Sequence, residues 1–412
     1  MFKKVSGTKD ILPGESCYWQ RIEEISRDIF RLYNFKEIRT PIIEDLALFN
    51  RCLGEFTEIV QKQMFVINNK DESYVLRPEG TASIARAYIE NNLDKTDGLA
   101  KLFYIGPMFR LERPQKGRLR QFHHIGTEII GCSSYEADVE TIALANRLLK
   151  AYGIEGYEII INNLGCSSDK QKLIANLKDK LQEKLNQLCP ECNIRFNSNA
   201  LRILDCKEEN CQKIIRSIDI ANKHLCAECD GFFKKVIAGL ENAGVNFKIS
   251  PYLVRGLDYY TRTVFEIKHS GLGAQDAIGA GGRYDNLIKQ LGGPDKNSVG
   301  FAFGVERLML AAQKTPPKLA EDLVYAIGMG EKARLALLKI TENLRDNAIP
   351  VVSNLEDRSL KAAMRQANDQ AAKYVLILGD NELEKNVITV KNMSDSTQKE
   401  ISIKEIATYL SM

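Results

Sequence analysis

The sequence predicts an α+β protein in which a mainly antiparallel sheet is interrupted by a small helical insertion and followed by a separate α/β domain. Three patterns support this prediction. Residues 102–110 and 119–130 are extended segments that flank a polar turn, which is typical of an antiparallel hairpin. Within residues 168–188, leucine recurs every four positions among charged side chains, as on a surface helix. After residue 322, strand and helix patterns alternate, which indicates a compact, largely parallel sheet.

The composition is that of an ordinary folded protein. A chain of 412 residues has room for roughly two to four domains. Hydrophobic residues make up 44% of the chain and charged residues 27%. The formal net charge of +3 excludes a surface that binds polyanions everywhere. Any contact with nucleic acid must therefore come from local basic patches.

The sequence predicts a cytoplasmic protein without a membrane partner. No apolar run follows the early lysines Lys3 and Lys4, and the longest apolar runs, such as residues 374–378, are far too short to span a bilayer. The ten cysteines would then stay reduced, so metal binding or no special role is expected of them rather than disulfides.

The N-terminal part combines one helix with several extended segments. Residues 15–33 have a helical apolar pattern, and residues 35–41 switch to an extended pattern that ends in a proline. Residues 65–67 and 74–76 are extended segments separated by turn-forming residues. This part should therefore form a helix, a strand and a hairpin.

The hairpin leads into a helix over residues 82–90, whose start carries polar groups. Thr81 could cap this helix while Glu79 interacts with the helix dipole. The alternative is that both side chains bind a ligand.

Polar side chains also gather on one face of the segment 119–130. Because side chains alternate along a strand, this face should collect Arg118, Arg120, Phe122, His124, Gly126 and Glu128. Gly126 has no side chain and leaves a gap where a ligand could lie. Arginine matches phosphate oxygens in a bidentate manner. The alternative is a solvated hairpin whose charges keep an edge strand soluble.

Six cysteines mark the predicted helical insertion, which follows a helix at residues 135–152 and a strand at 157–162. Two C-x2-C pairs have the spacing of zinc ligands, and four thiolates would close a tetrahedral structural site. The candidate ligands are Cys189, Cys192, Cys226 and Cys229. The alternative is a set of scattered buried thiols.

Strand patterns return after the insertion. Residues 252–266 are rich in β-branched and aromatic side chains. The glycine-rich turn at residues 279–285 does not fit G-x-G-x-x-G and has no parallel βαβ unit around it, so a dinucleotide site is excluded there. Residues 299–308 read as a strand that enters a helix with Arg307 in its first turn.

These patterns divide the chain into five segments. The first predicted domain comprises residues 1–165 and 249–312, with the insertion domain at 166–248. A polar, proline-rich linker at 313–321 leads to the last domain, 322–412.

The hairpin resembles motif 2 of the class II aminoacyl-tRNA synthetases, because Phe109 to Glu112 reads F-R-x-E and R-x-R-Q-F-H follows. The helix, strand and proline before residue 42 are similar to motif 1 of that class, and G-x-x-x-G-x-E-R at 300–307 is similar to motif 3. The resemblance implies a six-stranded antiparallel sheet, a homodimer, and ATP bound with Mg²⁺. It implies an ATP site of Arg110, Glu112, Arg118, Phe122 and Arg307, and a loop with Arg113, Gln115 and Lys116 at the tRNA acceptor end.

Two further motifs resemble the histidyl-tRNA synthetase family in particular, of bacterial type. They are R-P-E-x-T at 77–81 and the complete L-V-R-G-L-D-Y-Y at 253–260. The resemblance implies that L-histidine, ATP and tRNA(His) are substrates, that Arg255 and Arg110 are catalytic, and that 322–412 is an anticodon-binding domain. It implies a histidine pocket of Glu79, Thr81, His124, Glu128, Tyr259, Tyr260 and Tyr284.

One residue departs from the family pattern, since His124 stands where a glutamine is expected. A protonated imidazole there would repel the substrate ammonium, so activity is expected to fall below about pH 6.5 more steeply than in a His124→Gln variant. A rival interpretation is a histidine-binding regulatory paralogue that controls ATP phosphoribosyltransferase. The retained arginines Arg110, Arg255 and Arg307 and the appended domain favour the enzyme.

Overall fold

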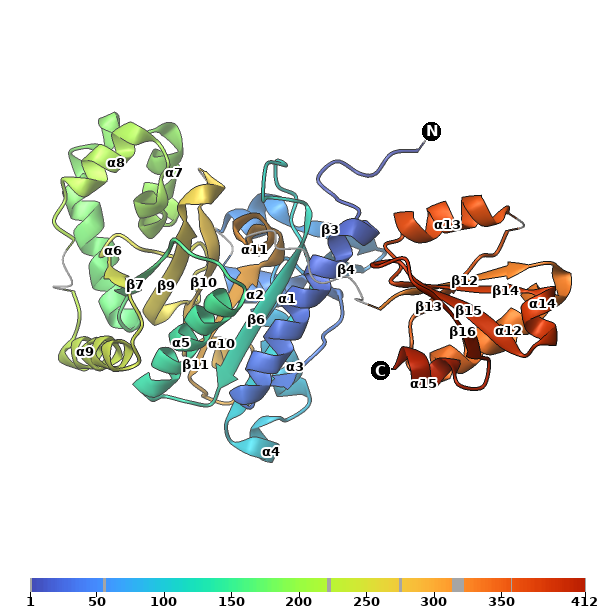
Figure 1. Cartoon of the computed structure of the whole chain (residues 1–412). Helices are drawn as coiled ribbons and strands as arrows, with labels where there is room; N and C mark the ends of the chain where they lie inside the picture. Colours follow the sequence, from blue (N-terminus) through green and yellow to red (C-terminus); the bar gives the residue numbers. More distant parts are fainter. Residues whose placement is uncertain are drawn as a thin grey trace. The chain divides into compact units, whose positions relative to one another are not determined.

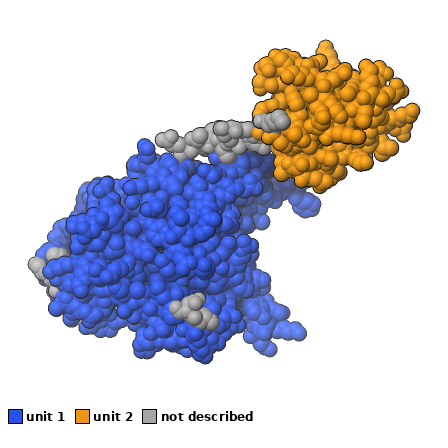
Figure 2. All heavy atoms as spheres, turned by 60° about the horizontal axis from the view of Figure 1, so that its bottom comes forward, with its two compact units in different colours: residues 1–315 blue, residues 316–412 orange. Residues whose placement is uncertain are grey.

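A computed structural model describes residues 2–54, 57–220, 224–273, 276–312, 322–356 and 358–411. The chain forms two compact units, Met1–Thr315 and Pro316–Met412 (Figure 2). The predicted linker at 313–321 lies outside the described residues. The predicted insertion belongs to the first unit, so its independence as a domain stays a prediction.

A large sheet forms the centre of the first unit, with the strand order β1-β5-β6-β11-β10-β9-β7-β8. All pairings between β5 and β7 in this order are antiparallel, which confirms the predicted six-stranded antiparallel sheet. The two outer strands have two residues each and pair in parallel, so they were too short to predict. The bounds are β1 Lys36–Glu37, β5 Ala100–Phe109, β6 Gln121–Ile130, β7 Tyr157–Asn163, β8 Lys248–Ile249, β9 Thr261–His269, β10 Ala277–Arg283 and β11 Ser298–Gly304.

Three long helices pack against one face of the large sheet: α1 (Pro13–Leu32), α5 (Tyr135–Ala151) and α9 (Ala227–Asn242). In Figure 1, α1 and α5 run across this face. Their apolar stripes meet the alternate strand side chains, such as Phe265 and Phe301, in one buried cluster. The polar side chains of the same strands are therefore left for the opposite face.

The N-terminal elements surround that opposite face. They include a three-stranded antiparallel sheet, and its hairpin of β3 and β4 confirms the sequence prediction. The bounds of these N-terminal elements are β2 Ile43–Asp45, α2 Leu46–Leu53, η1 Ile59–Gln63, β3 Phe65–Asn69, β4 Glu72–Leu76, α3 Thr81–Glu90 and α4 Asp94–Asp97. Three later short elements of the first unit are η4 Ser270–Leu272, α10 Leu287–Gln290 and α11 Val305–Ala311, of which η4 and α11 pack on the face covered by the long helices.

Helices make up most of the insertion. They are α6 Ser167–Gln182, η2 Leu185–Gln187, α7 Pro190–Ser198, η3 Ala200–Asp205 and α8 Glu209–Arg216. In Figure 1 they gather at the end of the sheet that carries β7 and β9. The leucines at 173, 177 and 181 are buried, as the four-residue spacing predicted. Of the helices that the structure describes, none is both long and apolar enough to cross a membrane.

Two sequence predictions about this unit were wrong. Residues 252–260 are not a strand, and β9 begins only at Thr261. The glycine-rich segment is not a turn but the strand β10, which pairs with β11. The two strands lie so close that a Cβ on Gly281 would be 2.2 Å from the carbonyl oxygen of Gly300. Glycine there allows β11 to approach closely, which a local reading of turn residues could not reveal.

The second unit contains a five-stranded sheet with the order β13-β12-β14-β15-β16. The first three strands are parallel, but β14, β15 and β16 pair in antiparallel fashion, so the prediction of a largely parallel sheet was only half right. A five-residue helix joins β14 to β15 and is too short for a parallel crossover. The bounds are β12 Val324–Met329, α12 Glu331–Asp346, β13 Val351–Ser353, α13 Leu360–Asp369, β14 Tyr374–Gly379, α14 Asp380–Glu384, β15 Val387–Asn392, β16 Gln398–Ser402 and α15 Ile406–Leu410.

Candidate active site

One pocket lies on the polar face of the large sheet, and residues from β5, β6, β10, β11, the start of α3 and the 253–260 segment line it. It brings together the predicted residues Glu79, Thr81, Arg110, Glu112, Arg118, Phe122, His124, Glu128, Arg255, Tyr259, Tyr260, Tyr284 and Arg307. The predicted loop residues Arg113, Gln115 and Lys116 are exposed and do not line the pocket. The pocket has an acidic end and a basic end.

Two buried glutamates form the acidic end. The carboxylate of Glu79 accepts hydrogen bonds from the backbone N–H groups of Thr81 (2.7 Å) and Ala82 (2.8 Å), which orients it at the start of α3. The Glu128 carboxylate accepts a hydrogen bond from the Thr81 hydroxyl at 2.7 Å and another from the Tyr284 hydroxyl. The capping role weighed for Thr81 therefore goes to Glu79, while the Thr81 hydroxyl holds Glu128.

Burial raises the pKa of both carboxyl groups. The pKa of Glu128 rises to about 8, even though the hydrogen bonds from Tyr284 and Thr81 act in the opposite direction. Burial also raises the pKa of Glu79 above its ordinary value, although three hydrogen bonds and Arg110 act to lower it. A cationic ligand would favour the ionised forms of both groups, so the acidic end is suited to an ammonium group.

Tyrosine rings enclose the acidic end. The ring centroids of Tyr259 and Tyr260 lie 4.6 Å apart, and those of Tyr259 and Tyr284 lie 5.6 Å apart. Burial raises the pKa of Tyr260 to about 12, so its hydroxyl keeps its proton and can donate a hydrogen bond.

The sequence interpretation missed Tyr104, which lines the pocket from β5. It also expected a ligand in the gap beside Gly126, and this was wrong. A Cβ on Gly126 would lie 2.4 Å from the Tyr104 ring, so the phenol fills that space. Tyr104 and Gly126 are directly opposite in the β5–β6 register. Pairing the two strands of the predicted hairpin residue by residue would have placed Tyr104 opposite Gly126.

Four arginines form the basic end: Arg110, Arg118, Arg255 and Arg307. Backbone carbonyl groups hold two of them. Arg110 Nε donates to the Pro78 oxygen at 2.9 Å, and Arg307 donates from Nε to the Gly117 oxygen at 3.0 Å and from Nη1 to the Ala277 oxygen at 2.6 Å. Arg110 Nη1 also lies 4.0 Å from the Glu112 carboxylate, but the closer contacts of both side chains are to neutral carbonyls, so much of their positive charge stays available to an anion.

Carboxylates hold the other two arginines. Arg118 pairs with Glu112, and Arg255 pairs with Glu266. The Nε of Arg255 is buried and has no hydrogen-bond partner among the described residues. Glu266 was named in the strand pattern but received no role. The structure shows that it fixes Arg255, which is a contact between side chains that no local motif predicts.

The predicted alternation of side chains between the two faces of the hairpin does not extend to Arg118 and Arg120, which lie before the second strand. Strand β6 begins at Gln121, and residues 111–120 form a loop closed by the bridge between Gln115 and Arg118. Arg120 consequently donates to the Ser6 and Glu112 carbonyls instead of facing the pocket. Turn residues rather than strand geometry set the direction of the side chains there.

The expectation about His124 also changes. Burial, together with Arg110, Arg307 and Arg77, lowers the pKa of this imidazole to about 3. His124 is therefore neutral between pH 5 and 8, and in this range it does not repel an ammonium group. Proximity to arginines decides this, and a standard histidine pKa could not predict it.

Between pH 5 and 8, we expect the activity of the His124→Gln variant and that of the wild type to fall at the same pH on acidification. The reason is that neither side chain changes its charge in this range. The pH profile of amino-acid-dependent ATP–pyrophosphate exchange measures this. A wild-type limb near pH 6.5 that disappears in the variant would contradict it.

The predicted zinc ligands do not lie in one group. Cys189 and Cys192 gather with Cys206 and Cys211, whereas Cys226 and Cys229 gather with Cys166 and Asp169. The predicted set of four is therefore wrong. The two C-x2-C pairs start different helices, α7 and α9, and sequence spacing could not show which helices adjoin.

This antiparallel sheet with an arginine-lined pocket at its hairpin defines a class II aminoacyl-tRNA synthetase. The family model described as histidyl-tRNA synthetase matches residues 7–308, and the model described as anticodon binding domain matches residues 323–412. The chain belongs to the histidyl-tRNA synthetase family.

Full-length relatives agree with this assignment. The chain is 46% identical over 405 residues to a histidine–tRNA ligase of Thermosipho melanesiensis, with 97% of this chain and 96% of the relative covered. It is 44% identical to a histidine–tRNA ligase of Halothermothrix orenii, with 97% of each covered. The crystal structure of apo S. aureus histidyl-tRNA synthetase matches with a TM-score of 0.84 at 32% identity, and each chain is fully covered.

Proposed function

We propose that this protein is a histidine–tRNA ligase that joins L-histidine to tRNA(His) in two steps. The histidine carboxylate attacks the α-phosphorus of ATP, which gives histidyl-adenylate and releases pyrophosphate. The terminal ribose 3′-hydroxyl of the tRNA then attacks the adenylate carbonyl, which gives histidyl-tRNA and releases AMP. The observation that carries the proposal is the single pocket with two glutamates at one end and four arginines at the other.

The acidic end would hold histidine. Glu79 and Thr81 would accept hydrogen bonds from the α-ammonium group, and Glu128 and Tyr260 would hold the imidazole. Tyr259, Tyr284 and the neutral His124 would complete the walls. An amino acid without the imidazole would forgo its hydrogen bonds with Glu128 and Tyr260 in a buried site, which can reject analogues by roughly 10⁴-fold without editing.

The basic end would hold the triphosphate. As the carboxylate attacks, negative charge builds on the α-phosphate oxygens, and Arg110 and Arg255 would stabilise it from fixed positions. Arg307 would hold the γ-phosphate, while Glu112, Arg118 and Phe122 would hold the adenine side of ATP. Phe122 already packs under Arg110, whose guanidinium lies 5.2 Å from the ring centroid.

Class II synthetases use ATP with Mg²⁺, and the pocket suits a metal that arrives with the nucleotide. Two of its carboxylates are already paired, Glu112 with Arg118 and Glu306 with His123, and Glu266 outside the lining pairs with Arg255. Phosphate oxygens and water would therefore be the main ligands of Mg²⁺.

Two regions would contact tRNA. Arg113, Gln115 and Lys116 lie exposed on the β5–β6 loop and could meet the acceptor end. The second unit would bind the anticodon, as its family model implies. Because translation takes place in the cytoplasm, we place the protein there.

A homodimer is part of the proposal. Four apolar side chains in or beside the small three-stranded sheet, near the motif 1 segment, are each more than 40% exposed: Ile42, Ile43, Val66 and Ile67. Apolar patches of this kind are commonly buried between subunits. Sedimentation equilibrium would test this, and a monomer at micromolar concentration would contradict it.

The decisive experiment measures ATP–pyrophosphate exchange and tRNA charging with each amino acid. We expect exchange with histidine alone, and charging of tRNA(His) alone. Histidine binding without exchange would instead support the regulatory paralogue. Exchange without charging would indicate an ATP-dependent ligase that does not act on tRNA.

Histidine affinity should depend on the ionisation of Glu128. The pKa of Glu128 is about 8 in the free pocket, so the group is largely protonated at pH 7, and its ionised form accepts an imidazole N–H more strongly than its protonated form. Between pH 7 and 8.5 we expect the histidine Kd to fall by about fivefold to tenfold, since each unit below the pKa costs up to a factor of ten. Isothermal titration calorimetry measures this.

The Glu128→Gln variant is the matched control, because it keeps the shape and removes the ionisation. Its Kd should be weaker and should not change over the same pH range. Free histidine keeps a neutral imidazole and a charged ammonium through most of this interval. An equal pH slope in both proteins would rule out Glu128 as the titrating group.

A further inference from the structure

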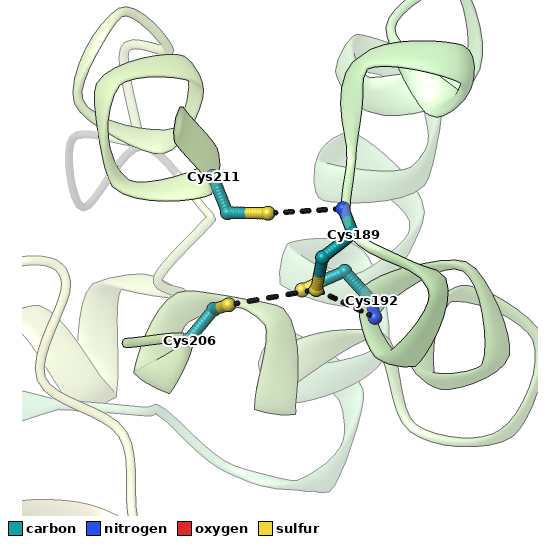
Figure 3. Close-up of side chains that lie close together, drawn as sticks. All are labelled: Cys189, Cys192, Cys206 and Cys211. Carbon is teal, nitrogen blue, oxygen red and sulfur yellow. Dashed lines mark hydrogen bonds between the residues drawn. The ribbon is translucent and has the colours of Figure 1, made fainter. Parts of the chain in front are cut away.

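Four cysteines of the insertion lie together, on or beside three helical elements. Cys189 is the N-cap of α7, Cys192 lies in its first turn, Cys206 is the C-cap of η3, and Cys211 lies in α8. Figure 3 shows their side chains pointing toward one another from these elements. Their sulfur atoms all lie within 4.8 Å of one another.

We propose that Cys189, Cys192, Cys206 and Cys211 bind one structural Zn²⁺ ion, which joins α7, η3 and α8. A tetrahedral zinc with Zn–S bonds near 2.3 Å places its sulfurs about 3.8 Å apart. The Cys189 and Cys206 sulfurs are already 3.9 Å apart. Small side-chain rotations would therefore close the site around the ion. Binding forms four Zn–S bonds, and the thiol protons go to water.

Backbone N–H groups donate hydrogen bonds to two of these sulfurs, which would stabilise them as thiolates. The N–H of Cys192 donates to the Cys189 sulfur at 3.4 Å, and the N–H of Cys189 donates to the Cys211 sulfur at 3.2 Å (Figure 3). Such second-shell hydrogen bonds orient ligands and stabilise their negative charge. The spacings C-x2-C and C-x4-C both fall within the range of structural zinc sites.

Burial and hydrogen bonds shift the pKa of three of these thiols in different directions. Burial raises the pKa of Cys192 and Cys206 above the ordinary thiol value. For Cys189, burial also raises the pKa, but hydrogen bonds from Cys192 and the neighbouring thiols outweigh it and lower the pKa overall.

The second cysteine group has a different character. The N–H of Cys226 donates to Asp169 at 3.1 Å, and Asp169 is fully buried. Burial raises the pKa of this carboxyl group, but the Cys226 backbone and the thiols of Cys229, Cys226 and Cys166 donate hydrogen bonds that lower it well below its usual range. These thiols donate to a buried carboxylate that belongs to their own group, so the proposal concerns the first group alone.

The zinc would also support the predicted active site. Cys206 follows the last residue of η3, and other residues of this short helix and its N-cap contact the 253–260 segment. Asn199 donates to the Asp258 carboxylate at 2.7 Å, and Arg202 donates to the Gly256 oxygen at 3.4 Å. Helices of six to nine residues are marginal alone, so the ion would fix η3 against the segment that carries Arg255. This consequence rests on the proposed function; the metal site does not.

Metal analysis of the purified full-length chain tests the proposal. We expect about one zinc per chain in the wild type and its loss in the Cys206→Ser/Cys211→Ser variant. The Cys17→Ser/Cys132→Ser variant is the matched control, since neither cysteine belongs to a cluster, and it should keep the metal. If the wild type holds a second zinc ion that remains in the Cys206→Ser/Cys211→Ser variant, that ion binds at another site, and the loss of the first ion still supports the proposal.

A second measurement does not depend on a variant that folds. Exchange of the wild type into Co²⁺ should give the intense visible bands and the sulfur-to-cobalt charge-transfer band of a tetrahedral thiolate site. Loss of the metal should make residues 183–220 sensitive to protease and should lower exchange activity several-fold. Three results would overturn the proposal: a wild type without zinc or Co²⁺ binding, equal zinc in both double variants, or a disulfide between these cysteines in protein kept under reducing conditions.

Discussion

The Arg255→Ala variant should lose histidine-dependent ATP–pyrophosphate exchange by about 10³-fold in kcat, a typical loss for one fixed donor to a developing anion. Arg255 is half-buried, Glu266 holds one side of its guanidinium, and its buried Nε has no partner in the part of the chain that the structure describes. A side chain held in this way needs little reorganisation when charge develops on the α-phosphate. The loss should therefore appear in kcat far more than in the KM for histidine.

Two controls separate catalysis from structure. Arg255→Ala leaves Glu266 with Lys268 as its remaining ion pair, at 3.4 Å, so the double variant Arg255→Ala/Glu266→Gln tests whether an unbalanced carboxylate causes the loss. It should be as inactive as the single variant. Arg113→Ala removes an exposed loop arginine and should leave exchange unchanged while it slows tRNA charging. A loss of less than tenfold for Arg255→Ala would exclude this residue as the main catalyst.

The Arg283→Met variant should destabilise the first unit by about 3–5 kcal/mol, because it leaves a buried charge without its partner. Arg283 and Asp138 both have fully buried side chains, and Arg283 Nε lies 3.0 Å from the carboxylate. The guanidinium also donates to the Cys132 and Ser134 carbonyls, each at 2.8 Å. Burial raises the pKa of Asp138, and Arg283 opposes this, so the unpaired carboxyl group would take up a proton at a higher pH.

Tryptophan fluorescence in a denaturant titration measures the change, because the single tryptophan, Trp19, lies in the first unit and reports its unfolding alone. The Arg283→Met/Asp138→Leu variant should recover part of the loss, since it removes both charges. Arg31→Met is the matched control, because its pair with Asp28 is exposed and should contribute under about 1 kcal/mol. A midpoint of Arg283→Met equal to that of Arg31→Met would refute the prediction.

The sequence predicted much of the candidate site because its residues occur in compact local motifs. The segments at 77–81, 109–128 and 253–260 each bring several residues of fixed spacing to one place. Tyr104 and Glu266 escaped detection because their roles depend on the opposite strand or on a neighbouring arginine. Gly126 was misread for the same reason, since the ring that fills its gap comes from another strand.

The second unit shows a similar limit. The periodicity of its first strands and helices predicted those elements closely. The direction of β15 and β16 was missed, since it depends on a short connection and on pairing across the sheet.

By itself, the sequence determined the order of the elements, the antiparallel hairpin and the chemical character of each motif, because these follow from local periodicity and residue type. Only the tertiary structure decided which cysteines meet, what lies beside Gly126, and that His124 stays neutral at a pKa of about 3. These properties depend on the packing and charge of residues far apart in the chain, and no local pattern contains them.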